Sequence, residues 1–387
     1  MADGDQSFIA RTVSRIDDID PALWDALASP KGVARNPFVS HAFLSALEAS
    51  KSVAPEAGWT PIHLILEDNG AVVGAVPLYA KGHSQGEYVF DHHWADAYER
   101  AGGRYYPKLV CAAPFTPVKG PRLLARTSET RSALGLAVAN VAARMGASSV
   151  HVNFIDNTDK EALTSIGYLP RMGEQYHWFN RDYEKYDNFL DALSSRKRKT
   201  IRRERREAVS SGLKIRQLVG SDISEQHWDA FWLFYQDTGA RKWGYPYLTR
   251  TFFRIIAETM ADELLMVVAE RDNEPIAGAL NFIGGDALYG RYWGCAEDHP
   301  FLHFELCYHQ AIEFAIERKL ARVEAGAQGQ HKIARGYEPV ATHSAHWIGD
   351  PGFRDAISQY LKAERAQTGA EIDALQQFIP FKKSVQD

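Results

Sequence analysis

The sequence predicts an α+β (α/β) fold with two tandem domains, each a mostly antiparallel mixed sheet flanked by helices. Three observations predict it. The 387 residues exceed the usual size of one hydrophobic core. Apolar residues make up 45% of the chain and charged residues 24%, which is a globular balance. Two distant stretches also repeat one order of turn, helix and strands. We therefore expect domains over residues 1–182 and 183–387.

The repeat begins with a turn and a helix. "NPFVSHAFLSALEAS" at 36–50 resembles "YPYLTRTFFRIIAET" at 245–259. In each copy a Pro-aromatic turn precedes a hydroxyl residue, Ser40 or Thr249, which can cap the helix that follows. Apolar residues then recur at helical spacing, so we expect one amphipathic helix in each half.

Strands follow each helix. "LILEDNGAVVGAVPLYA" from 64 parallels "VAERDNEPIAGALNFIG" from 268, with an Asp-Asn turn between two β-rich runs, which is typical of a hairpin. We expect a third strand in "EYVFDHHW", ending at Trp94, and in "ALYGRYWG", which contains Trp293. A helix (128–145 or 304–319) and a further strand ("SSVHVNFI" or "ARVEAG") complete each half.

Several segments resemble the FemAB-like family of predicted N-acyltransferases, within the GCN5-related N-acetyltransferase (GNAT) superfamily. They are "FDHHWADAYERAGGRYYPKL", "PFTPVKGPRLL", "FYQDTGARKWGYPYLTRTFF", "GRYWG" and "HFELCYHQAIEFAIERKLARVEAGAQGQHKIARGYEPVATHSAHW". The resemblance implies a tandem GNAT fold and direct transfer of an acyl or aminoacyl group to an amine, with no permanently bound cofactor. The donor is acyl-CoA in ordinary GNAT enzymes and aminoacyl-tRNA in relatives that build peptidoglycan bridges.

The sequence departs from ordinary GNAT enzymes at one loop. They hold the CoA pyrophosphate on an R/Q-x-x-G-x-G/A loop, whereas "GCAEDHPFLH" follows Trp293 here and lacks that glycine spacing. This departure weighs against acyl-CoA, and both donors stay open.

The motif "GAQGQHKIARGYEP" at 326–339 follows the strand "ARVEAG" and concentrates polar side chains. Strand carboxyl ends border the ligand crevices of open α/β sheets. We therefore expect Gln328, His331, Lys332 and Arg335 to bind substrate beside Glu324. The alternative is that these groups only tie the loop to the sheet.

A base must remove a proton from the attacking amine, because amines are mostly protonated at neutral pH. The candidates are Glu305, Glu324 and His331. Glu305 lies in the first turn of its helix, where it can equally serve only to stabilise the helix dipole. Backbone donors or Tyr292 can stabilise the oxyanion.

Other aromatic and polar residues are expected to line the substrate groove. In "DHHWAD", alternation along a strand would place the two histidines on opposite faces, so we expect no shared metal. Trp243 of "ARKWGYP" can stack a base or an acyl chain, or simply pack in the core. The expected groove residues are Asp91, Trp94, Trp243, Tyr292, Trp293 and His303.

"RKRKTIRRERR" at 196–206 holds eight basic residues in eleven, within a predicted helix at about 188–211. Self-repulsion favours an anionic partner such as tRNA phosphates, CoA or a membrane surface, although a solvated face is an open alternative. We expect Arg198, Arg202 and Arg205 to bind phosphate.

The start of the chain lacks the apolar run of a signal peptide, and no stretch approaches the roughly 20 apolar residues of a membrane span. We expect a cytoplasmic protein. The leading hypothesis is an N-acyltransferase whose crevice lies mainly in the second domain. The alternative is a non-catalytic module that binds phosphorylated or nucleic-acid ligands through the basic helix.

Overall fold

The computed structural model describes residues 8–243, 246–326 and 329–382, and the chain forms two compact units. The first comprises Met1–Gly173 and Ala341–Ala370, and the second Glu174–Val340 and Glu371–Asp387. This division differs from the expected halves 1–182 and 183–387, because the segment 341–370 returns to the first unit. The chain passes from one unit to the other within strands β9 (Leu169–Phe179) and β15 (Glu338–Ile348) and helix α12 (Pro351–Gln376).

The first unit contains two sets of strands. One is a four-stranded sheet in the order β1-β3-β4-β7, and the other has the order β15-β8-β6-β5-β2. Strands β6 and β8 are parallel, whereas β5 pairs antiparallel with both β2 and β6. Helix α4 packs on a core of strand residues that includes Leu64 and Val150. The strands are β1 (Ile9–Val13), β2 (Trp59–Pro61), β3 (His63–Asp68), β4 (Ala71–Val76), β5 (Leu78–Lys81), β6 (Lys108–Cys111), β7 (Leu124–Ala125) and β8 (Ser149–Ile155), and the helices are α1 (Pro21–Ala28), α2 (His41–Ala49), α3 (His92–Arg100), α4 (Ser128–Met145) and α5 (Asn157–Ser165).

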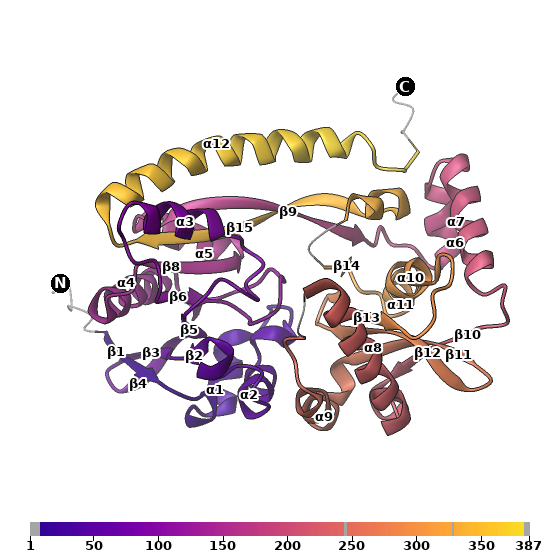
Figure 1. Cartoon of the computed structure of the whole chain (residues 1–387), viewed down its shortest axis with the longest axis horizontal. Helices are drawn as coiled ribbons and strands as arrows, with labels where there is room; N and C mark the ends of the chain where they lie inside the picture. Colours follow the sequence, from indigo (N-terminus) through magenta and orange to yellow (C-terminus); the bar gives the residue numbers. More distant parts are fainter. Residues whose placement is uncertain (1–7, 244–245, 327–328, 383–387) are drawn as a thin grey trace. The chain divides into compact units, whose positions relative to one another are not determined.

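The second unit has the strand order β10-β11-β12-β13-β14, followed by the Glu174–Phe179 part of β9. Strands β13 and β14 are parallel, and the other pairs are antiparallel. Helices α8 and α9 lie on one side of this sheet and α10 and α11 on the other (Figure 1). The strands are β10 (Lys214–Val219), β11 (Leu264–Arg271), β12 (Glu274–Ile283), β13 (Ala287–Cys295) and β14 (Arg322–Glu324), and the helices are α6 (Tyr186–Ala192), α7 (Ser195–Ala208), α8 (Glu225–Trp243), α9 (Arg250–Thr259), α10 (Leu302–Phe304) and α11 (Gln310–Glu317).

The predicted repeat of a capped helix is confirmed in both units. The Ser40 hydroxyl accepts a hydrogen bond from the Phe43 amide, and Thr249 accepts one from Phe252, so these residues cap α2 and α9. The hairpins β3–β4 and β11–β12 are also present, with Asn69 at a positive φ of 48° in the first turn. Asn tolerates this left-handed conformation better than most residues do.

Two local predictions are wrong. Residues 92–94 do not end a strand but begin α3, because Trp94, Ala95 and Tyr98 form a helical stripe that packs against α12. The predicted helix at 188–211 is two helices, since the chain breaks at Leu193 and Ser194, between α6 and α7. The predicted helix at 304–319 is present and consists of α10, a π-helical turn (Glu305–His309) and α11. Among the described residues, no helix has the length and hydropathy needed to cross a membrane.

Candidate functional site

In the second unit, the parallel strands β13 and β14 are paired along only part of β13. Strand β13 pairs with β14 only over Ala287–Tyr289, and its remaining residues continue to Cys295 beyond that pairing. The chain then turns at Phe301, which has a φ of 61°, into α10. The π-helical turn Glu305–His309 follows directly. Such turns are rare and concentrate at functional sites, so this corner is a candidate active site.

A hollow of about 720 Å³ lies between α8, the end of β13 and the start of α10. Its wall includes Trp293 and His303, whose ring centroids lie 5.2 Å apart in an edge-to-face arrangement. Both residues were predicted to bind substrate, and the structure brings them together. The hollow also borders Cys295 and the loop Ala296–His299.

His303 connects the hollow to the motif that follows β14. Its ring centroid lies 5.4 Å from that of Tyr308 and 6.5 Å from that of His331. The Tyr308 hydroxyl and His331 Nε2 are hydrogen-bonded at 2.9 Å. His331 begins a short 3₁₀ turn with Gln330, so its place beside His303 depends on the chain reversal after β14.

Two cations of the same motif are buried. Lys332 is 2% exposed and its Nζ donates a hydrogen bond of 2.9 Å to the Gly326 carbonyl oxygen. The Arg335 guanidinium lies 3.4 Å from the centroid of the Phe304 ring and pairs with Glu204 of α7 at 2.8 Å. The structure thus gathers the predicted residues His303, His331, Lys332 and Arg335 around one π-helical segment.

The pKa values of both Lys332 and His331 are lowered in this group. Burial lowers the pKa of Lys332 from its usual value to about 8. Burial also lowers the pKa of His331, and the nearby charges of Lys332 and Arg335 lower it further. His331 is therefore mostly neutral at pH 7 and can accept a proton. Lys332 is still largely protonated there and can donate hydrogen bonds.

Glu305 lies in the same segment but is held by other residues. It is 3% exposed, and its carboxylate accepts hydrogen bonds from Arg205 Nε and Nη2 and from Gln310 Nε2, all between 2.8 and 3.1 Å. Arg205 also pairs with Glu313 at 2.9 Å. These contacts make Glu305 an anchor for α7, and its predicted role as the base stays a prediction.

Glu324 belongs to a separate cluster. It is 4% exposed and accepts a hydrogen bond of 2.8 Å from Arg322, which agrees with the predicted placement of both on one face of the strand. His177 Nε2 lies 3.7 Å from its other oxygen. Within the described residues, no hydrogen bond or ion pair joins Glu324 to His331, so the predicted convergence of these two residues is not seen.

The remaining predicted groove residues lie elsewhere. Tyr292 packs against Tyr235 of α8, with ring centroids 5.4 Å apart. Asp91 and Trp94 are 0% and 1% exposed, so they do not line an open groove, because α3 turns them inward. Gln328 and the side chain of Trp243 lie outside the described residues.

The three arginines predicted to bind anions already have carboxylate partners. Arg198 pairs with Asp191 and Arg202 with Asp187, both at 3.3 Å on the surface, and Arg205 holds Glu305. Exposed cations of α7 that have no ion-pair partner in the described part of the chain are Arg196, Lys199, Arg203 and Arg206. The free positive charge of α7 is therefore carried by residues that were not singled out.

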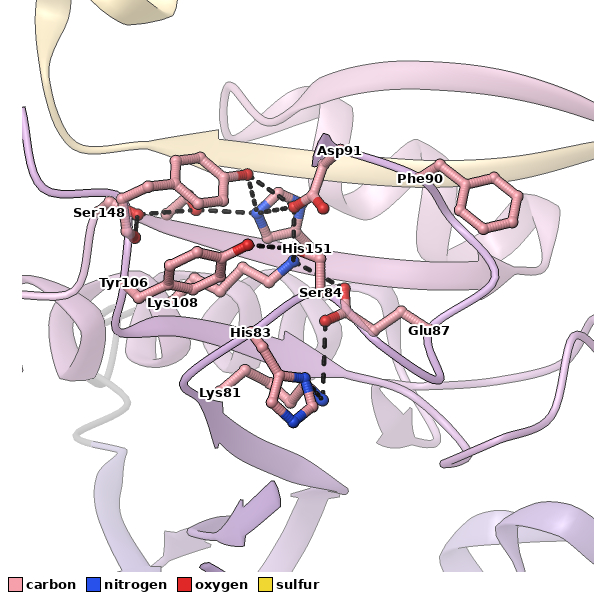
Figure 2. Close-up of polar contacts among 12 residues, drawn as sticks. Lys81, His83, Ser84, Glu87, Phe90, Asp91, Tyr106, Lys108, Ser148 and His151 are labelled. Carbon is pink, nitrogen blue, oxygen red and sulfur yellow. Dashed lines mark hydrogen bonds and ion pairs between the residues drawn. The ribbon is translucent and has the colours of Figure 1, made fainter. Parts of the chain in front are cut away.

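The structure reveals a second polar cluster, in the first unit, of which the sequence analysis singled out only Asp91 (Figure 2). Lys108 Nζ donates hydrogen bonds to Ser84, Glu87 and Asp91. Tyr105 donates to Asp91 at 2.7 Å. The cluster continues through His151 Nε2, 3.2 Å from the Tyr105 hydroxyl, and His151 Nδ1, 2.8 Å from His346 Nδ1. Its members come from two loops and three strands, so no sequence period marks them.

Burial perturbs the pKa values in this cluster in opposite directions. It lowers the pKa of Lys81 to about 7 and raises that of Glu87 to about 7. Burial would also raise the pKa of Asp91, but Lys108 and His151 outweigh it and hold that pKa well below its usual range. Asp91 and Lys108 therefore stay ionised around neutrality, whereas Lys81 and Glu87 each titrate there.

We expect Lys81→Met to change how stability depends on pH. Because the folded-state pKa of Lys81 is depressed to about 7, its contribution is fully present above the unfolded pKa of about 10.5 and is lost as the pH falls toward 7. The unfolding free energy of the wild type relative to the variant should therefore fall from pH 9 to pH 7, by about 1 kcal/mol per pH unit. Denaturant unfolding at pH 7, 8 and 9 measures this slope. An equal slope in both proteins would contradict the depressed pKa.

A family model matches most of the chain. The family model FemAB-like, described as peptidoglycan biosynthesis/recognition, matches residues 15–383. Among solved structures, the crystal structure of FemX is 13% identical with a TM-score of 0.53, covering 88% of this chain and 98% of FemX. The C-terminal domain of a putative lysylphosphatidylglycerol synthetase from Agrobacterium fabrum is 10% identical with a TM-score of 0.51, covering 88% and 95%.

A tandem GNAT protein from the clavulanic acid biosynthesis pathway is 12% identical with a TM-score of 0.46, covering 89% of this chain and 99% of its own. FemX and the A. fabrum domain, with TM-scores above 0.5, share the fold of this chain, and at these identities they show the fold alone. No curated protein matches the sequence.

Proposed function

We propose that this chain, which belongs to the FemAB-like family, transfers an acyl or aminoacyl group to an amine in the hollow beside Trp293 and His303. The observation that carries the proposal is that His303, in the wall of the hollow, packs against Tyr308 of the π-helical turn and against His331. The residue next to His331 is the buried Lys332, whose pKa is lowered to about 8. Perturbed titratable groups beside a cavity are typical of active sites. FemX and the A. fabrum domain share the fold, which agrees with this class of chemistry.

The residues divide the chemistry between them. The amine nitrogen attacks the acyl carbon and must lose a proton, which the neutral His331 accepts and later returns to the departing oxygen or sulfur. His331 is oriented for this by the hydroxyl of Tyr308. The negative oxygen that develops on the acyl carbon is stabilised by the Lys332 ammonium, because a buried cation is poorly screened by water. Trp293 packs against the apolar part of the donor.

The pH dependence of transfer should be bell-shaped. The acidic limb of kcat/KM reports His331 and lies below pH 6.5, since its pKa is lowered. The alkaline limb reports Lys332 and lies at about pH 8. We expect His331→Gln to lose about 10²-fold or more in kcat together with the acidic limb. A variant that keeps the wild-type acidic limb would exclude His331 as the base.

The donor is identified by thermal stability. A ligand that binds only the folded state raises the melting temperature. We expect either an acyl-CoA or an aminoacyl-tRNA to raise it, with uncharged tRNA and free CoA as matched controls, and mass spectrometry of the purified protein to reveal any retained ligand. The stabilising donor should then transfer its group to an amine acceptor. Absence of both stabilisation and transfer with every donor would refute the proposal.

The binding-module hypothesis keeps one supporting observation, the exposed cations of α7. A pure binder would lose RNA affinity on Arg196→Ser or Arg203→Ser, with steep salt dependence, and would show no transfer. A transferase would retain its chemistry in those variants at saturating donor.

A further inference from the structure

Two lysines face each other in the core of the first unit. Lys81 of β5 is the register partner of Lys108 of β6, and both residues are 0% exposed. Like charges directly opposite each other destabilise an antiparallel pair, and burial makes an unpaired ammonium costly. This cross-strand lysine pair therefore requires an anion, and the strands themselves provide none.

The anions come from one short loop, residues 82–91, which connects β5 to α3 and folds over the lysine pair (Figure 2). Glu87 and Asp91 both accept hydrogen bonds from Lys108, and the Gln85 carbonyl accepts one of 2.9 Å from Lys81. Both lysines are fully buried, and the Trp59 ring of β2 covers Lys81 as well, with its centroid 3.6 Å from Nζ. Its end is exposed, with the Phe90 ring 49% accessible to solvent.

The loop fits the lysine pair incompletely. Glu87 Oε1 lies 3.9 Å from Lys81 Nζ, beyond hydrogen-bond distance. Glu87 Oε1 and Asp91 Oδ1 are both buried without a hydrogen-bond partner in the described structure. Tyr88, between the two carboxylates, has a φ of 58°, which disfavours residues other than glycine. Only one oxygen of each carboxylate is therefore hydrogen-bonded, and the backbone of the loop is strained at Tyr88.

We propose that the cross-strand lysine pair Lys81–Lys108 is a binding site for a compact oxyanion, phosphate or carboxylate, which the loop 82–91 occupies with its own Glu87 and Asp91 until a ligand displaces it. Lys108 directs three hydrogen bonds to oxygens of this loop, and the tetrahedral oxygens of phosphate can accept the same three. Tyr105 adds a fourth donor.

The surroundings are compatible with an added anion. The other titratable groups that face the cluster are His83, Tyr105, Tyr106, Arg171, His151 and His346, and within the described residues Glu87 and Asp91 are its only carboxylates in contact with the lysines. Displacement of the loop removes the charge of Asp91 and the partly ionised Glu87, and leaves Lys108, which stays ionised, beside Lys81, which titrates near neutrality. A bound anion would neutralise Lys108 in place of the loop and would favour the charged form of Lys81.

The test is hydrogen exchange of the full-length protein, followed by mass spectrometry of peptides covering 82–91. Sodium phosphate and sodium malonate are compared with sodium chloride at equal ionic strength. We expect phosphate or malonate to accelerate exchange in this loop in a saturable way, and whichever anion acts identifies the source. Glu87→Gln weakens the contacts by which the loop competes with the anion. The anion concentration that gives half of the maximal exchange rate should therefore fall by about tenfold.

Two variants control the result. Glu56→Gln changes an exposed carboxylate of the same unit and should leave this half-maximal concentration unchanged. Lys81→Met with Glu87→Gln removes half of the proposed site, and should abolish the saturable response without unfolding, because Lys81 is only partly charged at neutral pH. The proposal is overturned if neither anion changes loop exchange in Glu87→Gln beyond chloride. The readout does not involve acyl transfer, so it is independent of the proposed function.

Discussion

Replacing Lys332 with methionine is expected to reduce transfer by about 10²–10³-fold while the protein stays folded. The reason is that Lys332 Nζ is buried and makes one described hydrogen bond, to the Gly326 carbonyl, which leaves other donors for the reacting oxygen. Methionine fills nearly the same volume without the charge. Single-turnover transfer with the identified donor measures the loss, which should be in kcat rather than in KM because the charge forms only in the transition state.

Lys214→Met is the matched control. Lys214 is exposed on β10 and makes no described side-chain contact. We expect it to transfer at the wild-type rate. Lys332→Met should also remove the alkaline limb near pH 8, a readout that a purely structural role would not change. Wild-type kcat in Lys332→Met would assign the oxyanion to another donor.

Much of the fold follows from local signals. The helices α2 and α9 could be predicted because a capping hydroxyl and a helical apolar stripe lie within ten residues of each other. The two hairpins could be predicted because an Asp-Asn turn adopts a left-handed backbone. The prediction of a strand ending at Trp94 was wrong because its helical stripe completes a core whose other half, Ile357 and Leu361, lies more than 250 residues later in the chain.

The site was predictable only in part. Trp293 and His303 flank a strand end and a helix start, and Lys332 and Arg335 share one turn, so the sequence could place them near a crevice. The contacts that decide their chemistry are not local. Glu305 meets Arg205 across 100 residues. The lowered pKa of Lys332 arises from burial, which no spacing of residues reports.

The ion pair between Arg205 and Glu305 predicts the largest effect on stability. Glu305 is 3% exposed, so Arg205→Met leaves a carboxylate buried without its cation. Breaking a buried pair in this way costs about 3–5 kcal/mol, and we expect the melting temperature to fall by roughly 10 °C. Differential scanning calorimetry measures the change.

Arg202→Met, three residues earlier on α7, is the matched control, because its pair with Asp187 is exposed on both sides and should contribute less than about 1 kcal/mol. Combining Arg205→Met with Glu305→Leu removes the stranded charge and should recover most of the lost stability, since an apolar pair of similar volume replaces a buried ion pair at little cost. If Arg205→Met alone has the melting temperature of the wild type, the buried carboxylate of Glu305 does not need the Arg205 cation of α7 for stability. Glu305 would then again be a candidate for the catalytic base.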